Sequence, residues 1–68
     1  MKNYELLLKG ECIKKINAID DIEAVMIFSK TKQLDSDSLF EIFDIAEIVY
    51  LVEDEAKHFR YLEKTVIL

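Results

Sequence analysis

The sequence predicts a small α+β domain whose elements follow the order β-α-β-α-β-β. Three observations support this fold class. The 68 residues suffice for one domain, residues 1–68. Segments with strand-like alternation or β-branched content stand beside segments with helical spacing. The absence of Pro and the single Gly leave no stretch with the composition of a linker. This order, in an α+β or a small α/β domain, predicts parallel crossovers followed by a final hairpin.

The first third of the chain changes its hydrophobic period. Tyr4, Leu6 and Leu8 alternate with Glu5 and Lys9, a period of two that Leu7 partly interrupts, and this pattern predicts a strand over residues 3–9. Residues 11–19 have helical spacing instead, and we expect a helix there. The apolar residues of this segment fall on one helical stripe: Cys12, Ile13, Ile16 and Ile19.

The middle of the chain predicts a strand followed by a long loop. The apolar block Ala24–Phe28 is bounded by Glu23 and Ser29. Its length of five residues suits a strand buried on both faces of a sheet better than a helix. The polar interval Ser29–Ser38 then predicts the loop.

A second helix is predicted over residues 38–47. Ser38 and Glu41 form a capping-box pattern, in which each side chain bonds a backbone N–H at the helix start. Asp35 and Asp37 also favour a helix N-terminus, because the helix dipole attracts negative charge there.

The remaining residues favour strands. Ile48–Val52 is rich in β-branched and aromatic side chains, which predicts a strand. Glu53–Glu55 predicts a polar turn, and a last strand is expected to include Phe59, Tyr61 and residues 66–68.

The alternative fold is an all-α dimer with a long C-terminal helix. Helical spacing can be followed from Leu39 to Leu62. A helix over residues 38–64 would be roughly 40 Å long, whereas the radius of gyration of so small a domain should be about 11 Å. Such a helix would need a second copy of the chain to cover its apolar face.

Charge is distributed unevenly along the chain. Residues 1–34 hold six Lys and five acids, and residues 35–68 hold nine acids and three bases, so net charges of +1 and −6 give −5 for the whole. No Lys, Arg or His stands between Lys32 and Lys57, an interval with eight acids. An acidic protein repels phosphate backbones, so we expect no direct binding to nucleic acid. The electrostatic complement is a basic protein surface.

The predicted helix over residues 38–47 gathers acidic side chains on one arc of about 120°. Neighbouring like charges repel each other on a helix, and a basic partner would compensate for this repulsion. The alternative is an ordinary solvated helix face. An aromatic side chain at the margin of the arc is a candidate anchor, because aromatic residues are enriched at interface hot spots. The predicted partner-binding residues are Asp37, Phe40, Glu41, Asp44 and Glu47.

The sequence carries no catalytic signature, and we predict that the protein is not an enzyme. His58 is the only histidine, and no Ser stands in a nucleophile elbow or beside a base. Asp35 and Asp37 begin like a calcium loop, but Leu39 and Phe40 stand where a ligand and a Gly are required. We therefore expect neither a metal nor a cofactor.

Cys12 is the only cysteine, which excludes an internal disulfide and a Cys-based zinc site. Its place on the helical stripe predicts a small buried core residue. The longest apolar runs are five residues, whereas a membrane span needs roughly 20, and the start of the chain is not typical of a signal peptide. We therefore expect a cytoplasmic protein that does not bind membranes.

The leading functional hypothesis is a non-catalytic interaction module, a small regulator or inhibitor that docks its acidic helix face on a basic protein surface. In a sharper form, the partner is a nucleic-acid-handling enzyme and the carboxylates stand in for phosphates. The competing hypothesis is a structural homo-oligomerisation domain or subunit. A hydrophobic content of 51% is high for so small an interior, which predicts a homodimer.

Overall fold

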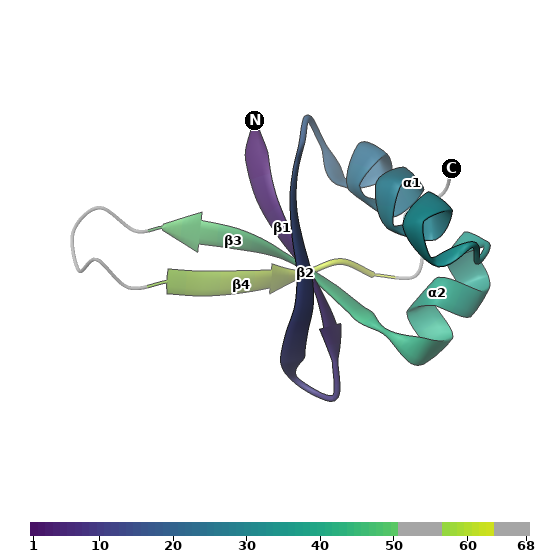
Figure 1. Cartoon of the computed structure of the whole chain (residues 1–68). Coiled ribbons are helices and arrows are strands. Elements are labelled where there is room, and N and C mark those ends of the chain that lie inside the picture. Colours follow the sequence, from purple (N-terminus) through teal and green to yellow (C-terminus); the bar gives the residue numbers. More distant parts are fainter. Residues whose placement is uncertain (51–56, 64–68) are drawn as a thin grey trace.

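The computed structural model describes residues 1–50 and 57–63. Within this part of the chain, four strands form one antiparallel sheet, and two helices lie together on one side of it (Figure 1). The elements are β1 (Lys2–Leu8), β2 (Glu11–Ala18), α1 (Asp21–Lys32), α2 (Ser36–Ile42), β3 (Asp44–Tyr50) and β4 (Lys57–Tyr61). The strands are ordered β2-β1-β3-β4 across the sheet, so β2 and β4 are its edges.

The α+β class is confirmed, but the described order of elements differs from the predicted one. Residues 11–18 form a strand instead of a helix, and Ala24–Phe28 belongs to α1 instead of a strand. The helix predicted over residues 38–47 is also wrong in its second half, because α2 ends at Ile42 and β3 begins at Asp44.

The three strand pairings within the described residues are all antiparallel, so the predicted parallel crossovers are wrong. The presence of β3 and β4 contradicts the all-α alternative. Part of the predicted C-terminal structure lies outside the described residues: positions 51–52 of the strand, the turn at 53–55 and positions 66–68.

A two-residue turn explains why the chain forms a second strand after β1. Lys9 and Gly10 both adopt positive φ angles, of 52° and 80°. This is the geometry of a type I′ turn, whose twist matches that of the strands it joins. The register shifts between Leu6 and Leu7, where Ile13 is the extra residue of a β-bulge.

Each helix begins after an aspartate that caps it. Asp20 accepts a hydrogen bond of 2.9 Å from the backbone N–H of Glu23, and Asp35 accepts one of 2.7 Å from that of Ser38. The Glu23 carboxylate also accepts a bond of 3.0 Å from the N–H of Ile19. These bonds satisfy N–H groups that have no partner within a helix. Asp35, and not the predicted Ser38, therefore caps α2.

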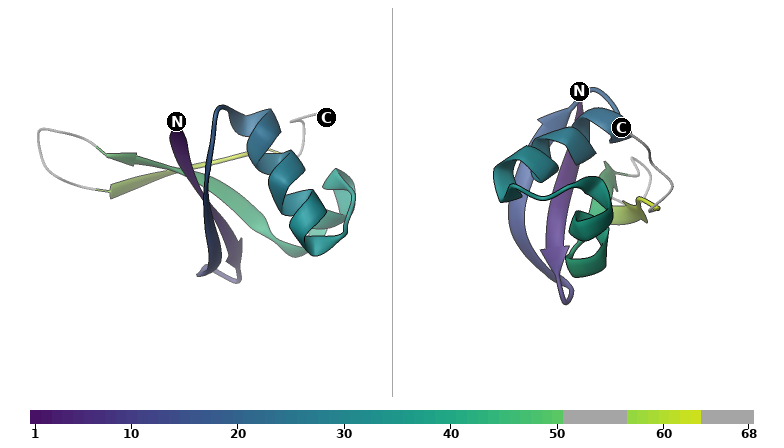
Figure 2. Two further views of the ribbon diagram at one scale, coloured as in Figure 1. Left: turned by 45° about the horizontal axis from the view of Figure 1, so that its top comes forward. Right: turned by 90° about the vertical axis from the view of Figure 1, so that its right-hand side faces the viewer.

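The hydrophobic core lies between the helices and one face of the sheet. Its buried cluster consists of Tyr4, Leu6, Ala18, Ala24, Val25, Phe28, Leu39, Ile45 and Leu62. The end of β3 and the start of β4 project away from the helices in Figure 1 and in the left-hand view of Figure 2. The helices therefore cover only part of the sheet.

Candidate functional site

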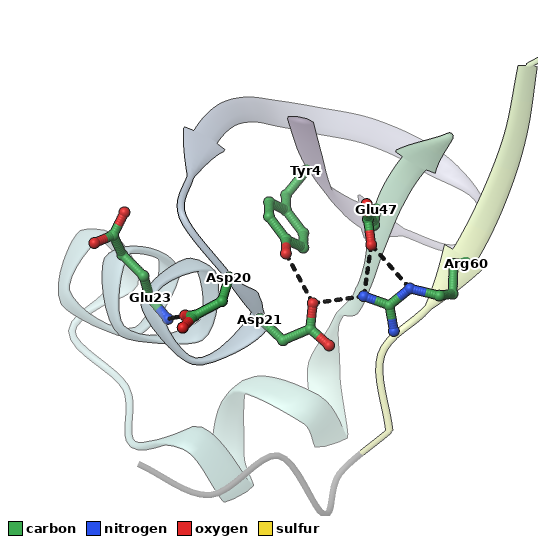
Figure 3. A network of polar contacts seen from close by, with 6 residues as sticks. All are labelled: Tyr4, Asp20, Asp21, Glu23, Glu47 and Arg60. Atoms are coloured by element: carbon green, nitrogen blue, oxygen red, sulfur yellow. Dashed lines mark hydrogen bonds and ion pairs between the residues drawn. The ribbon is translucent and has the colours of Figure 1, made fainter. Parts of the chain in front are cut away.

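Arg60 on β4 links four elements through polar contacts on the helix side of the sheet (Figure 3). Its Nη2 lies 2.5 Å from Oδ1 of Asp21 on α1 and 2.6 Å from Oε1 of Glu47 on β3. Its Nε donates a further bond of 2.9 Å to Glu47. The hydroxyl of Tyr4 on β1 donates to the same Asp21 oxygen at 2.7 Å. We refer to Tyr4, Asp21, Glu47 and Arg60 as the Arg60 network.

The contacts within the Arg60 network shift the pKa values of Tyr4 and Asp21. Burial and the hydrogen bond to Asp21 raise the pKa of Tyr4 above its ordinary value. Burial acts to raise the pKa of Asp21, but the bonds from Arg60 and Tyr4 and the charge of Arg60 hold that pKa below its usual range. At neutral pH the Tyr4 hydroxyl is therefore neutral, while Asp21 and Arg60 are charged.

This geometry supports a structural role for the Arg60 network. Its charged groups are bonded to one another, and a tyrosine with a raised pKa is a poor proton acceptor at neutral pH. The Glu47 side chain is only 14% exposed, which places its ion pair with Arg60 at the edge of the core. The network holds the start of α1 against three strands of the sheet.

The predicted partner-binding residues do not all lie on one helix. Asp37 and Glu41 are exposed on α2, one helical turn apart. Asp44 is exposed at the first position of β3, two residues after α2 ends. None of the three carboxylates forms an ion pair within the part of the chain that the structure describes. We refer to Asp37, Glu41 and Asp44 as the acidic corner.

Glu47 and Phe40 have surroundings that differ from those predicted. Glu47 lies on β3 and is bonded to Arg60, so it is not on the outer arc of a helix. The predicted arc ends early because α2 ends at Ile42. Phe40 is half-buried and packs against the core cluster, so its ring also contributes to packing.

Cys12 is exposed on the edge strand β2, so the prediction of a buried core residue is wrong. The predicted helical stripe that was to bury Cys12 does not form, because Glu11–Ala18 is a strand instead of a helix. Desolvation and a hydrogen bond to Glu5 raise the pKa of the Cys12 thiol. A raised pKa lowers the reactive thiolate fraction, so Cys12 lacks the activation that a catalytic nucleophile needs.

The surface formed by the described residues includes two hollows that bear on function. One of about 420 Å³ lies beside Asn3 and Asn17 on the first two strands. A broader groove of about 740 Å³ follows the outer side of α1 and is lined in part by Met26, Ile27 and Leu34. Its lining combines these apolar side chains with polar and charged ones, Glu23, Ser29, Lys30 and Gln33.

The Arg60 network could not be found by spacing in the sequence. Asp21 and Arg60 are 39 residues apart, and no local pattern connects them. One signal was available, because the hydroxyl of a buried tyrosine usually finds a hydrogen-bond partner. Because Tyr4 stands close to three leucines in a predicted strand, a polar partner for its hydroxyl could have been expected nearby.

Within residues 1–50 and 57–63, no three His, Cys, Asp or Glu side chains are grouped so that they could hold a metal ion. Neither helix in this part of the chain has the length and apolar character of a membrane span. Comparisons with protein-family models, with curated proteins and with solved structures give no match for this chain.

Proposed function

We propose that this protein is a non-catalytic interaction module that docks its acidic corner on a basic surface of another protein. The observation that carries the proposal is the exposure of Asp37, Glu41 and Asp44 without an ion pair among the described residues. Two of the chain's cations have contacts of their own. Arg60 is bonded within its network, and the Lys32 ammonium lies 5.6 Å from the ring centroid of Phe43.

Electrostatics favours a basic partner for the acidic corner. Asp37 and Glu41 are like charges at a spacing of four residues, which destabilises a helix by a few tenths of a kcal/mol. Contact with Lys or Arg side chains would replace this repulsion by attraction. The net charge of −5 would also speed the encounter with a basic surface.

A nucleic-acid-handling enzyme is the class of partner that we propose. Such enzymes carry Lys and Arg surfaces that bind phosphate backbones. A row of exposed carboxylates presents negative charge to the same surface, and inhibition by occupancy requires charge and shape but no catalytic group. The chain would then act as a small regulator or inhibitor.

The test compares two variants that remove the same number of charges. The corner variant combines Glu41→Gln with Asp44→Asn. The control variant combines Glu11→Gln with Glu63→Gln, which are exposed outside the acidic corner. Each variant has a net charge of −3 instead of −5. The wild-type chain and both variants are immobilised, retained proteins are identified by mass spectrometry, and the affinity of the purified partner is measured.

We expect a basic protein to bind the wild-type chain and the control variant, and to bind the corner variant about tenfold more weakly, a loss of about 1.4 kcal/mol. Binding should weaken with salt, because the Debye length falls from about 10 Å at 0.1 M to about 3 Å at 1 M. A DNA duplex should compete with the chain for the partner. Equal affinities of the corner and control variants would contradict the proposal.

A further inference from the structure

α1 is apolar on its outer face as well as on its core face. Its core face buries Ala24, Val25 and Phe28. On the outer face, Ile22 is 47% exposed and Met26 is 54% exposed. These two residues are four apart, so they lie one above the other on the helix. Large exposed apolar side chains that are flanked by polar ones are typical of a surface that contacts another protein.

The groove along α1 extends this apolar surface. Ile27 and Leu34 are half-buried, line the groove and pack against the core cluster. In the right-hand view of Figure 2, α1 lies toward the viewer on the outside of the molecule. We refer to Ile22, Met26, Ile27 and Leu34 as the α1 surface.

The charged residues beside the α1 surface are placed so that they would complement those of a second α1 helix that runs in the opposite direction. Glu23 and Lys30 both line the groove, and Lys30 forms no ion pair with the described residues. The first turn of α1 is acidic and the last turn is basic. When two α1 helices pack antiparallel about a twofold axis between Met26 and Ile27, position i faces position 53 − i. Glu23 of each copy then faces Lys30 of the other.

We propose that the chain forms a homodimer in which two α1 helices pack antiparallel across the α1 surface. Met26 of one copy meets Ile27 of the other at the centre, and a Glu23–Lys30 pair closes each side. This interface is independent of the acidic corner and requires no other protein. α1 has 12 residues and is about 18 Å long. Two helices of this length bury an interface of at most about 1,200 Å², which is typical of a weak dimer in equilibrium with its monomers.

Sedimentation equilibrium between about 10 µM and about 1 mM tests this homodimer, the range in which a weak dimer dissociates. We expect the wild-type mass to rise from that of an 8.0 kDa monomer toward twice that value. Met26→Lys should remain monomeric, because two cations would meet at the centre of the interface. Ile42→Lys is the matched control, since Ile42 is 52% exposed but lies on α2. It should associate like the wild-type chain.

Charge reversal tests the antiparallel orientation. Glu23→Lys and Lys30→Glu should each weaken association about tenfold, because like charges would then face each other. The double reversal should restore association, since opposite charges again meet across the interface. In a parallel pair each position would face itself, and the double reversal would restore nothing. Circular dichroism verifies that α1 stays folded, because Glu23 also bonds the N–H of Ile19.

A cross-link tests the position of the twofold axis. In a Cys12→Ser background, Met26→Cys should form a disulfide-linked dimer on mild oxidation, whereas Ile42→Cys should not. A wild-type chain that stays monomeric up to about 1 mM would overturn the homodimer. A dimer that survives Met26→Lys would overturn the assignment to α1.

Discussion

Arg60 is bonded to two carboxylates from different elements, Asp21 on α1 and Glu47 on β3. Glu47 is the less solvated of the two, because its side chain is 14% exposed. Loss of the guanidinium would leave this carboxylate without its counter-charge, which typically costs about 1–3 kcal/mol. The Arg60 side chain is 47% exposed, so screening by solvent lowers that cost.

We expect Arg60→Met to lower the free energy of unfolding by about 1–2 kcal/mol. Methionine keeps part of the aliphatic stem and removes the guanidinium. Lys14→Met is the control, because Lys14 is exposed on β2 and forms no ion pair with the described residues. It should change stability by no more than about 0.5 kcal/mol. Urea unfolding measures both variants, and equal effects would show that the network does not stabilise the fold.

Tyr4 makes stability depend on alkaline pH. Burial and the bond to Asp21 raise its folded-state pKa above the ordinary value of 10.0, so folding favours the neutral hydroxyl. Its stabilisation is fully present below about pH 10 and is lost as pH rises toward the folded-state pKa. We expect the wild-type chain to lose more stability than Tyr4→Phe between about pH 9 and pH 11 in urea unfolding. Parallel losses in the two proteins would rule out this linkage.

At the level of an element, the positive φ angles of the turn between β1 and β2 affect the stability of the fold. No atom lies within 4 Å of the place where a Cβ on Gly10 would stand, so Gly10→Ala changes only the conformational preference at a φ of 80°. We expect this change to cost about 1 kcal/mol. Lys9→Asn should instead stabilise by about 0.5 kcal/mol, because Asn-Gly suits a type I′ turn. Thermal unfolding in which both variants shift the midpoint the same way would contradict this turn geometry.

The regularity of an element's pattern decided whether it could be predicted. β1 keeps the period of two around Glu5 and loses it only at Leu7, and its bounds of Lys2–Leu8 are close to the predicted range of 3–9. β2 contains a bulge at Ile13, which places two apolar residues, Cys12 and Ile13, side by side in the sequence. That interruption removes the period of two and leaves a spacing typical of a helix.

α1 was mistaken for a strand because of its apolar outer face. Met26 stands where an amphipathic helix usually carries a polar residue, so Ala24–Phe28 forms an unbroken apolar block. The sequence nevertheless contains a start signal for this helix, since Asp20 and Glu23 have the spacing of a capping box. The structure shows both side chains bonded to backbone N–H groups at this helix start.

Only part of the candidate site could be predicted from the sequence. Asp37, Glu41 and Asp44 are exposed, in keeping with their predicted place on an outer surface. Glu47 could not be assigned correctly, because its partner is fixed by the register of β3 and β4, in which Glu47 lies opposite Arg60. Local periodicity contains no information about such pairing between strands.

At the scale of the whole molecule, the acidic corner and the α1 surface share no residue. Dimerisation through α1 would therefore combine two acidic corners in one assembly. A partner with two suitably spaced basic sites would then bind more tightly than either corner alone allows, through a raised effective concentration. The two proposals are separable, because Met26→Lys removes the dimer and the corner variant neutralises the carboxylates.

The footprint of the partner on the chain tests the interaction module most directly. Backbone amide chemical shifts are measured by NMR while the purified basic partner is added to the labelled chain. We predict that the signals of Asp37, Glu41 and Asp44 shift or broaden, whereas those of Glu11 and Lys14 on β2 stay unchanged. A footprint on β2 that leaves the acidic corner unaffected would contradict the proposed function.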